Sequence, residues 1–463
     1  MFALAALVLP LAAGCGGGGA GPGLDPNRNA DATDVTLRIA ANAVAGGKNA
    51  TGAQWINEYV IPTFTQRMKA KGVNVKVTFE GAGVEDEQYK TKRALDLKTR
   101  SGADLMNLDG IWTGEFAQAG YLLPLEQVVG EKANSWDGWS QIPGPIQGNS
   151  SFNGKRYGLP WGTDGRVIFY NKELFTKAGL PATWQPKSWD DILAAVRELK
   201  KLPGVTPVQL NAGTAMGEAT TMQGVLPMLA GTGRDVYANG KWMGASPQLN
   251  EVLGLYKTIF DEGLGDKEVQ LQAKGRDKSF AEFAEDKVGI LFEGDYFWRS
   301  VINPDEGIAP MEDRDATVGY ALIPAARPGS GVRGQDHVSY SGGATWMINP
   351  NTEYPQQAWE LLTFMGSAEA VRKANELTSI GITQRTDVNE QVLADDPLLK
   401  MISEQVLPIT STRPSLAAYT EVSVALQQAT ADIVSGRSPQ QAAQTYKASV
   451  ERAAGGAANV STG

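Results

Sequence analysis

The N-terminal third of the chain alternates between short strand-like segments and longer helix-like segments. Hydrophobic and polar residues alternate at 35–41 and 74–79, and a third apolar segment occupies 103–108. Between them, the apolar residues of 55–71 recur at helical spacing, and 89–99 is predicted to be a second helix. Strand, helix, strand, helix and strand at this spacing predict βαβ units and a parallel sheet.

The rest of the chain continues this mixture of strands and helices without an internal repeat. A helix is predicted over 189–201, with Ser188 as its N-cap and Asp190 and Asp191 at the positive end of its dipole. The other predicted strands are 166–171, 287–292 and 342–348, and the other helices are 248–262, 279–284, 355–365, 419–434 and 439–453. With 463 residues, 42% of them hydrophobic, the α/β chain has enough core for two lobes.

Charge and composition exclude several classes of function. A formal charge of −9 argues against a nucleic-acid partner, whose phosphates require a basic surface. The single histidine, His337, lies in a glycine-rich loop, and Cys15 is the only cysteine. We therefore predict no metal, no cofactor and no histidine-based catalysis, because such sites draw on these residue types. Carboxylate chemistry stays open, since Asp and Glu together number 51.

The chain begins with an apolar run that ends at its only cysteine. Residues 11–15, Leu-Ala-Ala-Gly-Cys, resemble a bacterial lipobox, although no Lys or Arg precedes the run. About 13 apolar residues are too few to span a bilayer, which needs about 20. We expect a signal peptide at 1–14, a lipidated Cys15 at the start of a flexible tether over 15–34, and anchoring on the extracellular or periplasmic face of a membrane.

Four stretches in a fixed order carry a resemblance to a known family. They are 103–125, ending in Gly-Tyr-Leu-Leu-Pro-Leu; 157–175, which contains Tyr-Asn-Lys-Glu-Leu-Phe; 292–298, Phe-Glu-Gly-Asp-Tyr-Phe-Trp; and 342–364. Together they resemble the extracellular solute-binding proteins of carbohydrate ABC importers, the maltose-binding-like group, over about residues 35–453. One departure is Tyr296, which stands where tryptophan is common in that group.

The resemblance implies two α/β lobes joined by crossing hinge segments, with a sugar held in the cleft between them. It places residues 35–164 and 340–384 in the first lobe, 165–339 and 385–455 in the second, and a flexible tail at 456–463. It also implies hinge closure around the ligand, delivery to an ABC permease and no catalysis. We expect a monomer.

Sugars need hydrogen-bonding partners for their hydroxyls and aromatic rings for their C–H faces, so we sought aromatic residues beside charged ones at strand ends. Ligands of open parallel sheets bind beyond the carboxyl ends of the strands. The candidate ligand-binding residues are Asn42, Glu80, Asp109, Trp112, Trp161, Asp164, Arg166, Glu218, Glu293, Asp295, Tyr296, Trp298, Gly343, Trp346, Arg385 and Arg413.

Structural roles compete with ligand binding at several of these positions. Trp161 and Trp346 could pack the lobes instead of stacking on a sugar, and Trp298 could belong to the core. Asp109 and Asp295 could be helix caps. In the resembled family the turn position of Tyr296 points its ring outward, which favours a place in the cleft.

Two other functions remain open from the sequence. A surface-anchored glycoside hydrolase would also place carboxylates beside tryptophans, although the predicted crossing segments differ from an eightfold βα barrel. The same fold could instead bind an anion, a peptide or a metal complex, but aromatic–acid pairs favour neutral polyols. An oligosaccharide, an α-glucoside by preference, is the expected cargo, and residue types do not determine its linkage or length.

Overall fold

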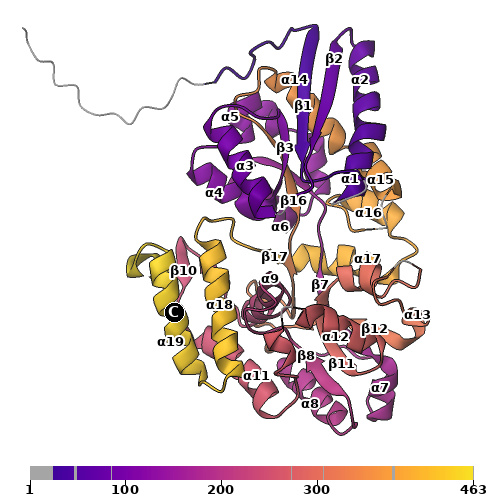
Figure 1. The fold of residues 1–463 in the computed structure, drawn as a ribbon, viewed down its shortest axis with the longest axis vertical. Coiled ribbons are helices and arrows are strands. Elements are labelled where there is room, and N and C mark those ends of the chain that lie inside the picture. The colour runs from indigo at the N-terminus through magenta and orange to yellow at the C-terminus, as the bar shows by residue number, and fades with distance from the viewer. Residues whose placement is uncertain are drawn as a thin grey trace, which may run out of the picture.

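The computed structural model describes residues 24–45, 49–84, 86–272, 274–305, 307–377 and 381–461. They form two α/β lobes, one above the other, joined by segments that run between them (Figure 1). The expected signal peptide at 1–14 and Cys15 lie outside the described residues. Within the described ranges, no helix is both long and apolar enough to cross a bilayer.

The first lobe is built on a five-stranded sheet in the order β2-β1-β3-β16-β6. Strands β1 and β2 pair in parallel along their length, β1 also pairs in parallel with β3, and β16 runs antiparallel to β3 and β6. The bounds of these strands are β1 (Asp34–Ala41), β2 (Asn74–Gly81), β3 (Leu105–Asp109), β6 (Gly158–Trp161) and β16 (Ala344–Ile348). The carboxyl ends of the parallel strands face the second lobe, where a ligand of this fold class would bind.

The helix expected over 55–71 starts earlier and is interrupted. It consists of α1 (Ala50–Trp55), a π-helical turn over Ile56–Val60, and α2 (Ile61–Ala70). Pro62 explains the interruption, because it has no N–H to donate and its ring crowds the preceding turn. The interruption places Trp55 at the end of α1, buried against the sheet.

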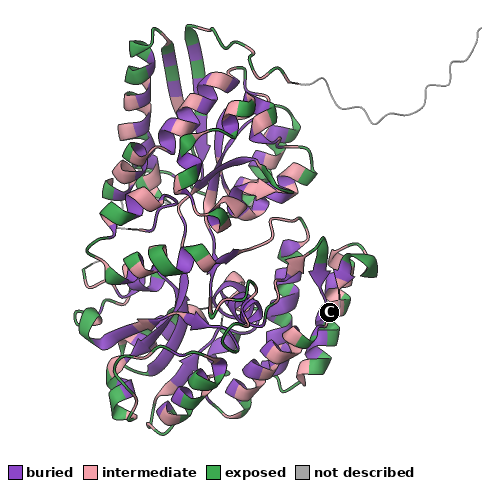
Figure 2. Cartoon of the chain, turned by 180° about the vertical axis from the view of Figure 1, so that it is seen from behind, coloured by how far each residue is buried: buried purple, intermediate pink, exposed green. Residues whose placement is uncertain are grey.

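The second lobe contains a four-stranded sheet in the order β12-β7-β11-β8. Its strands are β7 (Arg166–Asn171), β8 (Thr206–Gln209), β11 (Val288–Gly294) and β12 (Val318–Ala321), and its longer helices are α8 (Trp189–Leu199), α11 (Pro247–Asp261), α12 (Gly275–Ala284), α18 (Tyr419–Val434) and α19 (Pro439–Ala453). Ser188 caps α8 as expected, accepting from the backbone N–H of Asp191 at 3.3 Å. Figure 2 shows the second-lobe sheet and the inner part of the first-lobe sheet largely buried beneath helices whose outer faces are exposed, whereas β1 and β2 alternate exposed and buried residues at their free ends.

The chain crosses between the lobes at three places before its last helices. It leaves the first lobe over 162–165, between β6 and β7, and returns over 342–343, between β15 (Tyr340–Ser341) and β16. The third crossing comes later than the expected boundary at 384/385. Helix α16 (Thr386–Val392) still packs on α15 (Ala368–Leu377) of the first lobe, and α17 (Pro397–Met401) is the first element beyond it (Figure 1).

Side-chain hydrogen bonds explain why the third crossing is late. The Asn389 amide exchanges hydrogen bonds with the backbone of Thr383, at 2.8 and 2.9 Å. The Arg385 guanidinium donates to Asp387 and to the carbonyl of Gly366. These contacts hold 383–389 on the first lobe.

Both expected flexible termini are ordered where the structure describes them. Arg28 donates to the carbonyls of Thr352 and Pro350, both at 2.6 Å, so the C-terminal part of the expected tether is docked on the first lobe. At the other end, β18 (Val460–Ser461) pairs with β10 (Lys241–Met243) and buries Val460. Hydrogen bonds to distant residues, from the Arg28 side chain at one end and from the backbone of β18 at the other, hold both segments against the lobes.

Candidate functional site

Charged residues from both lobes meet where the crossing segments run together. We call Asp109, Asp164, Arg166, Glu218 and Arg413 the polar junction. Arg413 Nη2 lies 3.6 Å from Asp109 Oδ1, at the end of β3, and its Nη1 lies 3.3 Å from Glu218 Oε2, at the start of α9 (Glu218–Thr220). Arg413 thus bridges a carboxylate of the first lobe and a carboxylate of the second.

The carboxylates of this bridge are more exposed than the arginine between them. The side chains of Asp109 and Glu218 are 40% and 42% exposed, whereas that of Arg413 is 12% exposed. Tyr419 donates to Glu218 Oε2 at 3.0 Å, and Ser423 donates to its Oε1. Burial alone would lower the pKa of Arg413, but Asp109, Tyr419 and Glu218 raise it above its ordinary value. Burial raises the pKa of Asp109 above its ordinary value, although Arg413 opposes that rise. The junction therefore offers fixed carboxyl oxygens between the lobes as hydrogen-bond acceptors.

The other pair of the junction locks two crossing segments together. Asp164 pairs with Arg166 and accepts from the backbone N–H of Gly342 at 2.7 Å. Arg166 also donates to Gln223 at 2.9 Å and to the carbonyl of Tyr340 at 3.0 Å. Burial tends to raise the pKa of Asp164, but Arg166 and the Gly342 N–H outweigh burial and hold that pKa below its ordinary value. The pair fixes the two strands about which the lobes would move.

A cavity of ≈ 290 Å³ opens in the first lobe at the same edge of the sheet. We call it the tryptophan cavity; its lining includes Asn42, Trp55, Asn107, Trp161, Ala344 and Trp346. The rings of Trp55 and Trp161 stack with centroids 4.5 Å apart and 27° between their planes. Ala344 pairs with Asp109 on one side and Trp161 on the other, so all three side chains share one face of the sheet. The cavity therefore lies beside the polar junction.

Other expected ligand residues adjoin this cavity. Asn42 lines it, but its amide is bonded to the backbone of Val84 and to Asp86. Trp346 is 2% exposed and lines the cavity from β16. Gly343 precedes β16 with φ +147, and its carbonyl accepts from Gly110 N–H at 3.1 Å. Gly343 therefore shapes the backbone between the cavity and Asp109.

The turn after β11 points one expected side chain outward and two inward. Tyr296 is 37% exposed, and the guanidinium of Arg276 lies 5.9 Å from its ring centroid. Glu293 and Asp295 are 0% exposed, contrary to the expectation that they contact ligand. Arg276 holds both oxygens of Glu293, at 2.6 and 2.8 Å. Glu293 lies on β11, an inner strand of its sheet, and Asp295 directly follows that strand and accepts from Arg299 and from the backbone N–H of Gly165, so both acids are already paired within the protein.

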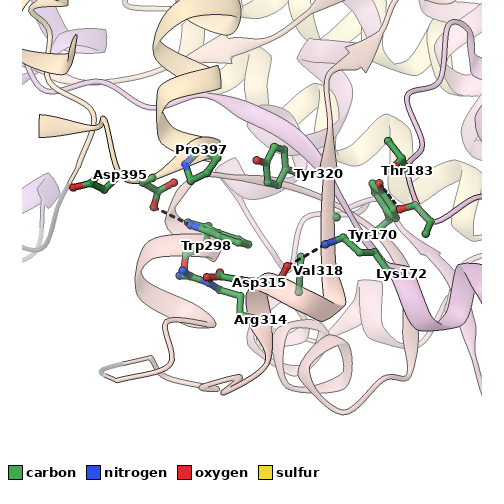
Figure 3. Close-up of a pocket in the computed structure, with 13 residues that line it drawn as sticks. Tyr170, Lys172, Thr183, Trp298, Arg314, Asp315, Val318, Tyr320, Asp395 and Pro397 are labelled. Carbon is green, nitrogen blue, oxygen red and sulfur yellow. Dashed lines mark hydrogen bonds and ion pairs between the residues drawn. The ribbon is translucent and has the colours of Figure 1, made fainter. Parts of the chain in front are cut away.

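Trp298 also lies away from the polar junction, contrary to expectation. It borders a separate cavity of ≈ 420 Å³ in the second lobe, together with Tyr320 and Lys172 (Figure 3). Its Nε1 donates to Asp396 at 3.1 Å, and the guanidinium of Arg314 lies 3.8 Å from its ring centroid. Trp298 therefore anchors the segment before α17 rather than a ligand in the cleft.

Three further candidates are engaged elsewhere. Trp112 is 8% exposed and packs in a small core between the sheet and the helices of the first lobe. Glu80, at the end of edge strand β2, lies 3.6 Å from Arg38 and 3.9 Å from Arg93. Arg385 is bound to Asp387, as described above. The structure brings none of the three to the polar junction or to the tryptophan cavity.

Comparison with known proteins identifies the family. The family model of the bacterial extracellular solute-binding proteins matches residues 47–372, well over half of the chain. The chain belongs to this family. A sequence from Brucella abortus (strain 2308), assigned to the binding proteins without a named solute, is 25% identical to this solute-binding protein over 331 residues, 71% of this chain and 74% of its own.

Solved structures share the two-lobed fold of this solute-binding protein. An ABC transporter solute-binding protein of Thermotoga lettingae, bound with α-D-tagatose, superposes with a TM-score of 0.65 at 24% identity, over 90% of this chain and 99% of its own. The cyclic α-maltosyl-1,6-maltose binding protein of Arthrobacter globiformis gives a TM-score of 0.70 at 20% identity, over 91% and 99%. The likenesses establish the fold, and the family is one of solute binders rather than enzymes.

The sequence did not identify two residues of the site of this solute-binding protein. Trp55 supports Trp161, and Tyr419 orients Glu218. Trp55 ends α1, the helix that follows the carboxyl end of β1, and this order along the chain could have marked it. Tyr419 heads an amphipathic helix and carried no such signal. Among the described residues, no cluster of His, Cys, Asp and Glu could hold a metal ion. The site therefore presents acceptors, one bridging arginine and stacked aromatic rings.

Proposed function

We propose that this solute-binding protein captures a carbohydrate between its lobes and delivers it to the permease of an ABC importer by hinge closure. The observation that carries the proposal is the stacked pair Trp55 and Trp161 beside the exposed carboxylates of Asp109 and Glu218. Rings stack on the C–H faces of sugars, and ionised carboxylates accept from their hydroxyls. The sugars named with the similar solved structures support the same cargo class.

Within this proposal the site residues have separate tasks. Asp109 and Glu218 accept from ligand hydroxyls, and Arg413 donates between them. Trp161 of the first lobe and Tyr296 of the second form the stacking surfaces. Asp164 and Arg166 act on the crossing segments, so that they position the lobes rather than the sugar. We propose that the protein works as a monomer.

A thermal-shift screen of residues 24–463 against neutral mono- and oligosaccharides tests this function. A hundredfold excess of ligand over its Kd stabilises the folded state by about 2.7 kcal/mol, which raises the melting temperature. We expect Trp161→Ala to weaken binding about tenfold or more, because it removes the stacking surface. Trp184→Ala is the matched control, since Trp184 is also a half-buried tryptophan packed against aromatic rings but lies in the second lobe.

The other outcomes of the screen distinguish the alternatives. A shift that is equal in the wild type and in Trp161→Ala would contradict the placement of the sugar at Trp161. Release of reducing ends from a polysaccharide would overturn the transport function in favour of a hydrolase. Stabilisation by sn-glycerol 3-phosphate instead of sugars would favour another solute; a partial relative from Agrobacterium fabrum, 24% identical over 188 residues, is named for that ligand.

We also propose that the protein is anchored to the outer face of the membrane through a diacylglycerol on Cys15. The lipobox-like sequence at 11–15 supports this anchor, and an extracellular family agrees with export. Cys15→Ser is expected to move the protein from the membrane fraction to the soluble fraction, because the thiol that carries the lipid is lost. Gly16→Ser retains the thiol and serves as the control. Membrane retention of Cys15→Ser would contradict the anchor.

A further inference from the structure

The guanidinium of Arg276 has one nitrogen that the protein leaves free. Arg276 lies in the first turn of α12 and donates from Nε and Nη2 to the two carboxylate oxygens of Glu293, at 2.6 and 2.8 Å. Nη1 makes no hydrogen bond to any described residue, yet it is not one of the buried nitrogens that lack a partner, so solvent reaches it. The whole side chain is 29% exposed. Arg276 can therefore donate to a ligand while it keeps its own ion pair.

The end of β11 places Arg276 on the side of the second lobe that faces the first. Gly294, the last residue of β11, pairs with Arg166, which follows directly after the chain has crossed between the lobes. The backbone at the start of α12 packs against Met216, two residues before Glu218 of the polar junction. Arg276 thus shares one surface with the carboxylate that we propose for ligand binding.

Tyr296 supplies an aromatic wall beside this donor. Its ring is 37% exposed, and the guanidinium of Arg276 lies 5.9 Å from the ring centroid. Arg314, which covers the ring of Trp298, lies only 3.8 Å from its centroid. Arg276 therefore stands beside the Tyr296 ring without covering it. A sugar unit that lies against this ring meets the free nitrogen with one of its oxygens.

The ion pairs of the site favour a neutral ligand. Glu293 is 0% exposed and has both oxygens bound to Arg276, so the pair carries no net charge. Arg413 is likewise flanked by two carboxylates, those of Asp109 and Glu218. A carboxylate or phosphate on the ligand would find these guanidiniums already paired and would face the exposed carboxylates of the junction. A hydroxyl or a ring oxygen can accept from Arg276 without that repulsion.

We infer that Arg276 is a ligand-binding residue that sets specificity for a neutral sugar unit. Its Nη1 donates to an oxygen of the unit that lies against Tyr296, while Glu293 fixes the guanidinium and cancels its charge. The inference rests on the proposed function and adds a donor and a charge class to the same site. Arg276 lies in a helix, 17 residues before Glu293 in the chain, so a search of strand ends does not find it.

Arg276→Lys tests the donor by isothermal titration calorimetry with glucose, galactose, maltose and trehalose. Lysine keeps a positive charge for Glu293, but its single nitrogen cannot fill the ion pair and also reach the ligand. We expect the affinity for the tightest-binding of these sugars to fall about tenfold, equivalent to about 1.4 kcal/mol. Arg197→Lys is the matched control. Arg197 also donates from Nε and Nη2 to both oxygens of one carboxylate, that of Glu262, but it lies on α8, at the end of the second lobe away from the first (Figure 1).

Uronic acids test the charge of the site. Glucuronate and galacturonate differ from glucose and galactose by one carboxylate, and we expect each to bind at least about tenfold more weakly than its neutral counterpart. Glu293→Gln removes the counter-charge of Arg276, so it is expected to shift the ratio of the two affinities about tenfold toward glucuronate over glucose. Arg276→Lys retains the ion pair and therefore tests the inference even if Glu293→Gln does not fold.

The outcomes separate this inference from the proposed function. Full sugar affinity in Arg276→Lys, an equal loss in Arg197→Lys, an unchanged ratio in Glu293→Gln, or tighter binding of the uronates by the wild type would each overturn the role of Arg276 and leave carbohydrate binding in place. Binding of none of these sugars would overturn both.

Discussion

Replacing Asp295 with alanine is expected to lower the free energy of unfolding by about 3 kcal/mol, the lower end of the range for breaking a buried ion pair. Asp295 is 0% exposed, accepts from Arg299 Nε at 2.7 Å, and accepts from the backbone N–H of Gly165 at 3.0 Å. Alanine would leave the Gly165 N–H without its acceptor. Arg299 is 27% exposed and can regain water, so the loss stays at the lower end. Urea unfolding measures it.

The matched control is Asp261→Ala. Asp261 forms an ion pair of the same spacing with Lys257 on α11, but its side chain is 48% exposed, so we expect a loss below about 1 kcal/mol. If Asp295→Ala kept full stability and lost only sugar affinity, Asp295 would be a ligand residue after all. Equal losses in both variants would mean that burial of the pair contributes nothing.

Gly343→Ala is expected to destabilise the protein by about 3 kcal/mol and to weaken ligand binding. Gly343 has φ +147, a conformation that side-chain-bearing residues rarely adopt, and an added Cβ would lie 2.7 Å from the carbonyl oxygen of Gly162. Backbone strain of this kind costs about 1–3 kcal/mol, and overpacking adds a similar amount. Relieving this strain would move the neighbouring Ala344, which pairs with Asp109 on one side and with Trp161 on the other. Thermal unfolding and sugar titration measure the two effects.

The neighbouring Gly342→Ala separates this strain from a general sensitivity of the crossing segment. A Cβ on Gly342 would meet Arg413 Nη2 at 3.5 Å and Asp164 Oδ1 at 3.6 Å, which are ordinary contacts. Its N–H bond to Asp164 would remain, so we expect a change below about 1 kcal/mol. Comparable losses in both variants would contradict the assignment of strain to Gly343.

The sequence could predict the features that depend on local pattern and on order along the chain. Alternation at 35–41 and 74–79 predicted two parallel strands, and Ser188 before two aspartates predicted the cap of α8; the structure confirms both. The order of the four family-like stretches predicted the two-lobed fold, which the comparisons confirm. These features could be predicted because strands and caps depend on neighbouring residues, and because the order of the family-like stretches can be read directly along the chain.

Tertiary structure decided which polar and aromatic side chains meet. Glu293, Asp295 and Tyr296 are consecutive or nearly so, yet the two acids are buried in ion pairs with Arg276 and Arg299, whereas Tyr296 is exposed. Trp298 and Trp346 looked alike in sequence, but one donates to Asp396 and the other adjoins a cavity with Asn107. Apart from Arg299, which pairs with Asp295 one helical turn away, the partners of these side chains lie tens to hundreds of residues away in the chain. Burial and pairing at such separations depend on sheet order and on strand crossing, which local composition does not specify.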